Sequence, residues 1–120
     1  MPDASAPHLG DLERKVMEIL WDCPHELCTR KVLEQTSTDL AYTTVATVLT
    51  NLARKGMVEK VLSGRTWAYR ALTSRGEYVA ALMTQVLLAG GDHAPPLRHF
   101  VESLSAADVA TLRGLLADGS

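Results

Sequence analysis

Apolar residues recur at spacings of three and four positions in three stretches of the N-terminal half, which is the pattern of amphipathic helices. The first stretch predicts a helix over residues 10–22, because Pro24 follows it and disfavours helical backbone just before itself. The second predicts a short helix that Thr29 caps and that stops near residues 36–39. The third predicts the clearest helix, over residues 41–55.

The third predicted helix has two chemically different faces. Its apolar stripe follows the spacing of a helix packed on a core, and Gly56 supplies the C-terminal stop. At about 100° per residue, the opposite face collects threonines and one arginine, and it contains no carboxylate. Short polar groups without negative charge suit close approach to base edges and phosphates. The stripe comprises Val45, Val48, Leu49, Leu52 and Ala53, and the opposite face Thr43, Thr47, Thr50 and Arg54, with Thr44, Ala46 and Asn51 on its flanks.

The pattern changes from helical to extended after residue 56. Residues 57–62 and 66–72 are rich in β-branched, apolar and aromatic side chains and predict two strands. Ser63, Gly64 and Arg65 between them predict a tight hairpin, because glycine adopts unusual backbone angles at no steric cost. The result is a two-stranded ribbon with an arginine at its tip. Alternation places one set of side chains on a common face: Trp67, Tyr69 and Ala71.

The C-terminal third predicts three further amphipathic helices. Ser74 and Glu77 have the spacing of a capping box that opens the first of them, and two glycines at residues 90–91 end it. Another helical stretch follows two prolines, and the last helix begins at Ser105. The apolar sides of these helices either pack on the N-terminal part of the same chain or pack on a second chain. The second arrangement is favoured, because two copies can cover each other's apolar surface. These sides carry Val79, Leu82, Met83, Val86, Leu87, Leu97, Phe100, Val101, Leu104, Leu112, Leu115 and Leu116.

Three helices followed by a hairpin is the order of a winged helix-turn-helix, in which the third helix enters the major groove and the wing flanks it. The fold class is therefore mainly α with a small β-hairpin. We expect a winged-helix DNA-binding domain over residues 1–73 and a helical dimerisation region over residues 74–120. At 120 residues the chain has no room for a two-domain enzyme.

The charge is distributed unevenly along the chain. The formal net charge is −2, but residues 40–75 hold six basic residues and one acidic residue, a surplus of five positive charges. Residues 76–120 hold two basic and five acidic residues, a surplus of three negative charges. Phosphate binding depends on locally clustered charge and not on the chain total, so a nucleic-acid partner fits this distribution.

Composition and missing motifs exclude several classes of protein function. The 47% hydrophobic and 22% charged residues are typical of a soluble globular protein, and neither a secretory signal nor a membrane-length apolar run is present, which predicts a cytoplasmic protein with no membrane partner. A glycine-rich phosphate loop, a nucleophile elbow and paired carboxylates in an apolar setting are all missing, so we expect neither an enzyme nor a cofactor.

Several stretches resemble one known family, the penicillinase and methicillin-resistance repressors (BlaI/MecI, with the copper-responsive CopY branch). The most specific is Ala41-Tyr42-Thr43-Thr44-Val45, continued by Thr47, Leu49, Leu52, Lys55 and Gly56. Leu9-Gly10-Asp11-Leu12-Glu13 and the wing residues Gly64, Arg65 and Tyr69 also match, so the resemblance covers nearly the whole chain.

The resemblance implies a transcriptional repressor whose winged domain binds an inverted-repeat, double-stranded DNA operator, with antibiotic-resistance or cell-envelope operons as targets. It assigns base contacts to Thr43, Thr44 and Thr47, and backbone contacts to Thr29, Arg54 and the Gly64-Arg65 turn. It also assigns Val79–Leu87 and Leu97–Leu116 to the homodimer.

The resemblance further implies an inactivating protease that cleaves before a phenylalanine, here between His99 and Phe100. His99 stands where the best-known members have asparagine, which is a departure from the family pattern. The cysteine pair of the copper-responsive branch is missing from the C-terminus, which argues against control by copper.

Two alternatives stay open on the sequence. Cys23, His25 and Cys28 with their neighbouring carboxylates allow a metal site, but four ligands at zinc-site spacing are not present and free thiols are favoured. A winged helix can also serve as a protein–protein interaction module without DNA binding. Salt-dependent affinity for a duplex would separate that function from a repressor.

Overall fold

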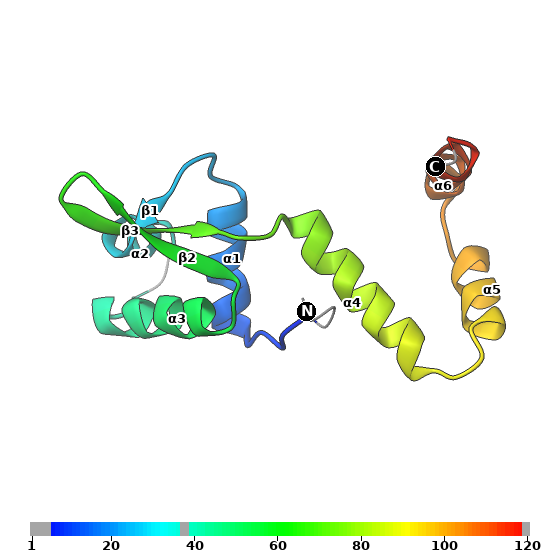
Figure 1. Ribbon diagram of the computed structural model, residues 1–120, viewed down its shortest axis with the longest axis horizontal. Helices are drawn as coiled ribbons and strands as arrows, with labels where there is room; N and C mark the ends of the chain where they lie inside the picture. The colour runs from blue at the N-terminus through cyan, green and yellow to red at the C-terminus, as the bar shows by residue number, and fades with distance from the viewer. Residues whose placement is uncertain (1–5, 37–38, 119–120) are drawn as a thin grey trace. The chain divides into compact units, whose positions relative to one another are not determined.

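The computed structural model describes residues 6–36 and 39–118. The elements run in the order α1 (Asp11–Trp21), β1 (Leu27–Cys28), α2 (Thr29–Gln35), α3 (Tyr42–Arg54), β2 (Val58–Ser63), β3 (Thr66–Ala71), α4 (Arg75–Ala89), α5 (Ala94–Glu102) and α6 (Ala106–Ala117) (Figure 1). The chain divides into two compact units, Met1–Leu82 and Met83–Ser120. The first is called the winged unit below, and the second the C-terminal unit.

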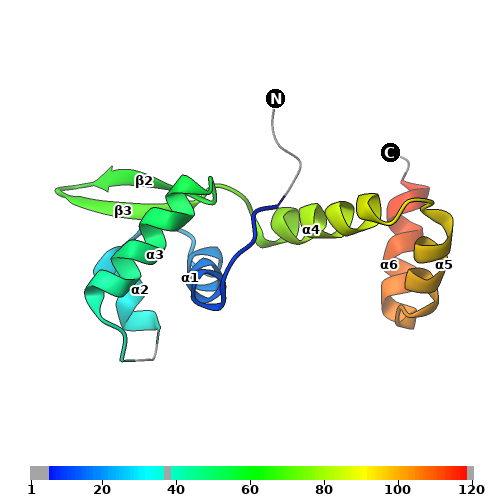
Figure 2. The same cartoon turned by 90° about the horizontal axis from the view of Figure 1, so that it is seen from below.

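The winged unit contains a three-stranded antiparallel sheet in the order β1-β3-β2. Helices α1, α2 and α3 lie on one side of the two long strands (Figure 2). The predicted hairpin is confirmed, with Ser63 paired to Thr66 across the turn. The third strand, β1, falls where the pattern indicates only a loop. Its pairing of Cys28 with Ala68 makes β3 the central strand and explains why Ala68 is buried on the face opposite Tyr69.

The core of the winged unit confirms the predicted apolar stripes of the three helices. Because α1, α2 and α3 converge under the sheet, each contributes side chains from the face that its spacing predicts. The largest fully buried side chains are Met17, Leu49, Leu52, Val16, Val32 and Val45.

One predicted helix cap is wrong. The N-cap position of α2 is Cys28, whose side chain makes no capping bond, and Thr29 is the first helical residue. Thr29 is only 8% exposed, because it lies at the joint between β1 and α2. The helix ends at Gln35, and residues 37 and 38 of its predicted end region lie outside the described residues.

The capping box at the start of α4 is confirmed. The Ser74 backbone amide donates to the Glu77 carboxylate over 2.8 Å, and the Glu77 amide donates to the Ser74 hydroxyl over 3.1 Å. These bonds lower the pKa of Glu77, the backbone amide of Ser74 contributing most. Tyr78, one turn further on, is buried in the core of the winged unit, and Leu82 is partly buried against it. The boundary between the two compact units therefore falls inside α4, after Leu82.

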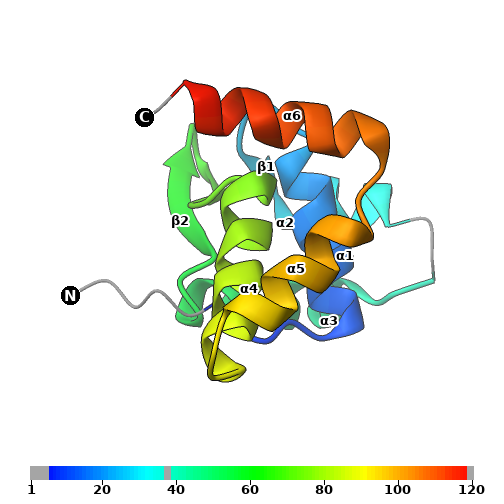
Figure 3. The ribbon, with the colours of Figure 1, turned by 90° about the vertical axis from the view of Figure 1, so that its right-hand side faces the viewer.

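Within the C-terminal unit, none of the described residues is buried. Ser105, where the sequence predicts the last helix to begin, caps α6 through a 3.1 Å bond that it accepts from the Asp108 amide. Figure 3 shows α5 (yellow to orange) and α6 (orange to red) as separate helices that run in different directions. Many large apolar side chains are exposed here, including Val86, Leu88, Leu97, Phe100, Leu115 and Leu116. Among the described helices, none has both the length and the apolar character needed to cross a bilayer.

Candidate nucleic-acid interface

The outward face of α3 presents hydroxyl groups that its own fold does not use. Thr43, Thr44 and Thr47 are exposed, and within the described residues their hydroxyls make no hydrogen bond to protein. Thr50 differs, because its hydroxyl donates to the Ala46 carbonyl over 3.0 Å. The apolar stripe of the helix is fully occupied in the core, so the threonine face is free to meet another molecule.

A groove of about 700 Å³ lies beside this face, between the start of α2, the outer side of α3 and the wing. It is lined by aromatic, small polar and basic side chains, with no carboxylate among the lining residues. A groove with one sign of charge attracts anions of the opposite sign. Its lining is Cys28, Thr29, Arg30, Tyr42, Ala46, Thr50, Lys60, Arg65, Thr66, Trp67 and Tyr69.

The strand register explains why the wing side of this groove is cationic. Lys60 and Tyr69 are paired, and two positions further on Leu62 pairs with Trp67, so these side chains share one face of the hairpin. The Lys60 ammonium lies 5.1 Å from the centre of the Trp67 ring. Glu59 and Arg70 are also paired, but they point to the opposite face, where they form a 2.6 Å ion pair.

Ion pairs reduce the cationic surplus that the sequence shows. Lys55 lies 2.7 Å from the Glu13 carboxylate, Arg70 binds Glu59, and Arg75 binds carboxylates of α1. Burial acts to raise the pKa of Glu13, but the bonds from Lys55 and the Gly10 amide outweigh it and lower that pKa overall. Four basic residues around the threonine face and groove make no ion pair within the described part of the chain: Arg30, Arg54, Lys60 and Arg65.

Of the predicted DNA-contacting residues, the structure brings Thr29 and Arg65 together in the groove and leaves the others exposed on α3 and at the wing turn. Gly64 adopts a φ of 65° in the wing turn, and Arg65 beside it is exposed. Arg54 donates to the Asn51 side chain over 3.1 Å at the C-terminal end of α3. Thr29 lines the groove at its floor, where its low exposure leaves little of it accessible.

Sequence reasoning missed four contributors to this surface: Arg30, Tyr42, Lys60 and Trp67. Trp67 is 53% exposed, although alternation puts it on the face of the buried Tyr69. Toward the hairpin tip the wing extends beyond the core. Successive side chains of a strand there point alternately into the groove and toward the outer surface, and none of them points into the core. The position of Trp67 could have been found from the register of the hairpin, because a two-residue turn fixes that register and pairs Trp67 with Leu62.

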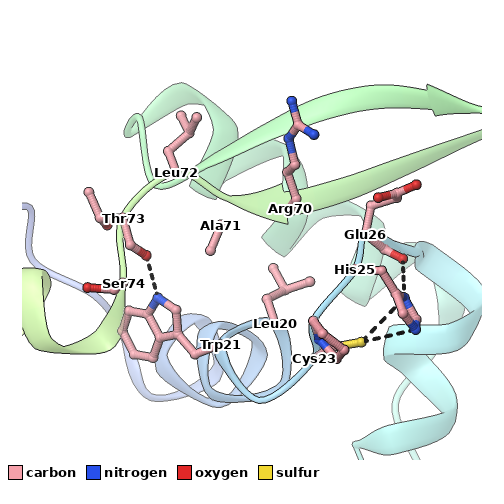
Figure 4. Close-up of a pocket in the computed structure, with 11 residues that line it drawn as sticks. Leu20, Trp21, Cys23, His25, Glu26, Arg70, Ala71, Leu72, Thr73 and Ser74 are labelled. Carbon is pink, nitrogen blue, oxygen red and sulfur yellow. Dashed lines mark hydrogen bonds between the residues drawn. The ribbon is translucent and has the colours of Figure 1, made fainter.

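A second pocket, of about 400 Å³, contains the thiol that the metal-site alternative needs (Figure 4). The Cys23 sulfur lies 3.5 Å from Nδ1 of His25, and Cys28 lines the other groove. Both cysteines are free. Within residues 6–36 and 39–118, no three His, Cys, Asp or Glu side chains come together as metal ligands.

Comparison with known proteins identifies the family. The model of the penicillinase repressor family matches residues 9–118. The chain belongs to the penicillinase repressor family. It is 41% identical over 120 residues to the transcriptional regulator BlaI of two Mycobacterium tuberculosis strains, CDC 1551 / Oshkosh and H37Rv, covering 96% of this chain and 87% of each relative. Members of this family are transcriptional regulators and not enzymes.

Solved structures show the same fold. The monomeric form of Bacillus licheniformis BlaI in complex with the blaP half-operator aligns with a TM-score of 0.52 at 24% identity, over 62% of this chain and 92% of that one. A MarR family protein from Bacillus stearothermophilus aligns with a TM-score of 0.53 at 14% identity, over 93% and 73%. The predicted winged helix-turn-helix class is therefore confirmed.

Proposed function

We propose that this regulator is a cytoplasmic, homodimeric repressor that binds a dyad-symmetric DNA operator. Helix α3 of each protomer enters the major groove, and the wing lies on the backbone or in the minor groove. The observation that carries the proposal is the set of unpaired hydroxyls of Thr43, Thr44 and Thr47 beside a groove lined without carboxylates. Threonine hydroxyls bond to bases or phosphates, and their methyl groups pack against the thymine methyl.

Phosphate contacts position the helix in this proposal. The four unpaired cations flank α3, with Arg54 at its C-terminal end and Arg30, Lys60 and Arg65 around the groove. A duplex with α3 in its major groove brings phosphates close to the wing side of the helix and to its C-terminal end, where those cations lie. The relative from Bacillus licheniformis is described in complex with a half-operator, which supports the same role here.

Exposed apolar surface in the C-terminal unit supports the homodimer. Val86 is 72% exposed and Leu116 is 72% exposed, and burying such side chains stabilises an interface by roughly 25 cal/mol per Å². A second copy offers the same apolar face, which a two-fold axis makes self-complementary. Leu82 takes no large part in this interface, because it packs partly on the winged unit.

Phe100 tests the dimer directly. Phe100→Asp places a charge in the proposed interface, so we expect the chain to sediment as a monomer and to keep its affinity for a single half-site. Leu72→Asp is the matched control, because Leu72 is 50% exposed in the winged unit and Phe100 is 46% exposed. A Phe100→Asp chain that stays dimeric would contradict the proposed interface.

Proteolytic relief of repression is part of the same proposal. His99 and Phe100 lie inside α5, with the His99 side chain 80% exposed. A protease needs extended backbone, so cleavage at this bond requires α5 to unwind. The helix has only nine residues and two prolines in its first turn, and so short a helix contributes little stability of its own.

Selection of genomic DNA fragments by the purified full chain, followed by sequencing and footprinting, tests the proposal as a whole. We expect fragments that contain an inverted repeat, with protection of two half-sites about one helical turn apart. We also expect affinity that falls steeply with salt. Protection of one unsymmetrical half-site would contradict the dimer. The absence of salt-sensitive binding to any duplex would favour the protein-interaction module instead.

A further inference from the structure

The start of α4 is fastened to α1 by a group of charged and aromatic side chains far from the DNA face. We call this group the root cluster. None of its members lines the groove beside α3. It consists of Arg14, Glu18, Trp21, Asp22, Arg75 and Tyr78.

Arg75, the first residue of α4, bonds directly to the C-terminal end of α1. Its Nε donates to Oε1 of Glu18 over 2.9 Å, and its Nη2 donates to the same oxygen and to Oδ1 of Asp22, the latter over 2.8 Å. The partners lie 57 and 53 positions away in sequence. A guanidinium that bridges a carboxylate of α1 and the carboxylate of its C-cap residue has its direction fixed by geometry as well as by charge.

Trp21 lies at the centre of the cluster. Its indole nitrogen donates to the Thr73 carbonyl over 2.8 Å, two residues before α4 begins (Figure 4). The guanidinium carbons of Arg14 and Arg75 lie 5.6 and 5.5 Å from its ring centre. The Tyr78 ring is 5.7 Å away, and its hydroxyl donates to the Pro7 carbonyl over 3.1 Å.

The charges in the cluster support one another. The bond from Arg75, followed by the bond from Arg14, lowers the pKa of Glu18. The bonds to Asp22 and Glu18 raise the pKa of Arg75. Both partners therefore stay ionised near neutral pH, and the connection between α1 and α4 persists there.

We propose that Trp21 and Arg75 are positioning residues that fix the direction in which α4 leaves the winged unit and thereby set the half-site spacing that the dimer accepts. The inference rests on the proposed homodimer. Residues 83–89 of α4 belong to the C-terminal unit, so this one helix leads from the DNA-contacting part toward the pairing segments.

The length of α4 makes its direction consequential. Fifteen residues of helix span roughly 22 Å at about 1.5 Å per residue. A swing of about 20° at the root would move the far end by roughly 7 Å, which is about two base pairs at 3.4 Å each. A dimer whose α4 roots are loose would therefore tolerate half-site spacings that the wild type rejects.

The test measures binding of the full chain to duplexes that carry two copies of the selected half-site at centre-to-centre spacings from about 8 to 13 base pairs, and to a duplex with one copy. Arg75→Met removes the bridging guanidinium, and Trp21→Phe removes only the indole donor and keeps an aromatic ring. Lys15→Met is the control, because it removes an exposed cation of α1 that makes no ion pair within the described residues.

We expect both variants to bind the single half-site within about twofold of the wild type and to lose about tenfold at the preferred spacing, with a flatter spacing profile. If the wild type prefers one half-site spacing and both variants keep that preference, the inference is overturned and the homodimer stands. A wild type that binds one and two half-sites equally would overturn the homodimer and the inference together. An equal loss on every duplex in both variants would show a folding role only.

Discussion

At the residue scale, the four threonines of α3 that point outward are not equivalent. Thr50 uses its hydroxyl within the helix, by donating to the carbonyl four residues earlier. Thr43, Thr44 and Thr47 do not, so their donors and acceptors are available to a duplex. The outward face of α3 is therefore divided between three candidate base-contacting residues and one residue that is occupied.

Thr47 offers a test that separates hydroxyl from methyl recognition. Thr47→Val keeps both the shape and a methyl group and removes the hydroxyl, whereas Thr47→Ser keeps the hydroxyl and removes the methyl. We expect base preference at one operator position to change by roughly 1–3 kcal/mol in the variant that loses the contacting group. Competition binding against single-base operator variants measures this. If both variants weakened specific and random duplexes equally, direct base contact by Thr47 would be wrong.

Arg65 is expected to act on all sequences alike. Arg65→Ala removes one unpaired cation of the groove, so affinity should fall for specific and random DNA together, and the slope of log K against log salt should shrink by about one per protomer. Arg70→Gln is the matched control, because Arg70 is already paired with Glu59 on the opposite face of the wing. A slope that changed as much for Arg70→Gln would contradict the assignment of the groove face.

The site residues that could be predicted were those fixed by local periodicity. Helical spacing alone placed Thr43 and Thr47 outward with Thr44 on the flank of the same face, and turn chemistry placed Arg65 at the wing tip. Arg30 and Trp67 could not be placed this way, because the groove forms only where α2, α3 and the wing converge. The ion pairs that neutralise half of the basic residues in residues 40–75 could not be predicted either, since each joins positions far apart in sequence or on opposing strands.

At the element scale, the predicted helices and the hairpin are all confirmed to within a few residues, and the missing element was β1. Two residues, Leu27 and Cys28, carry no strand pattern of their own and become a strand only because β3 offers them an edge. That short strand nevertheless decides the layout, since it buries Ala68 and places the start of α2 beside the groove.

The wing turn depends on a left-handed residue. Gly64 has a φ of 65°, and a Cβ added there would meet no atom within 4 Å. Any loss of stability on substitution therefore comes from the unfavourable backbone angles and not from a clash with neighbouring atoms. We expect Gly64→Ala to destabilise the fold by about 1 kcal/mol, and Gly64→Asn to cost less because asparagine tolerates these angles. Urea unfolding of both variants measures the difference. Equal stabilities for the two would show that the turn changes its conformation on substitution.

At the scale of the whole molecule, the two units differ in how they are stabilised. The winged unit has a buried core, whereas the described residues of the C-terminal unit bury none of their side chains completely. This difference follows from the sequence only in part. Apolar residues lie on one face of α1, α3 and α5 but are spread around α4 and α6, and the pattern does not reveal that Tyr78 draws the start of α4 into the winged unit.

Acid should weaken the winged unit through Glu18. Its pKa is lowered in the folded protein, mainly by the bond from Arg75, so its ionised form stabilises the fold above the ordinary value of 4.5. That contribution is lost as the pH falls below 4.5 and through the lowered pKa. We expect the difference in unfolding free energy between wild type and Glu18→Gln to be largest near neutral pH and to shrink toward pH 3. A difference independent of pH would contradict the role of the Glu18 charge.

The placement of the two tryptophans gives the molecule optical probes of both proposed events. Trp67 stands half-exposed in the cationic groove, and Trp21 lies close to two guanidinium groups at the root of α4. Since the chain has only these two tryptophans, replacing either with phenylalanine leaves a single indole to be excited selectively. Fluorescence from Trp67 in the Trp21→Phe chain should respond when a single half-site binds, and fluorescence from Trp21 in the Trp67→Phe chain should respond when the helix root loosens, so the two events can be followed in two parallel titrations.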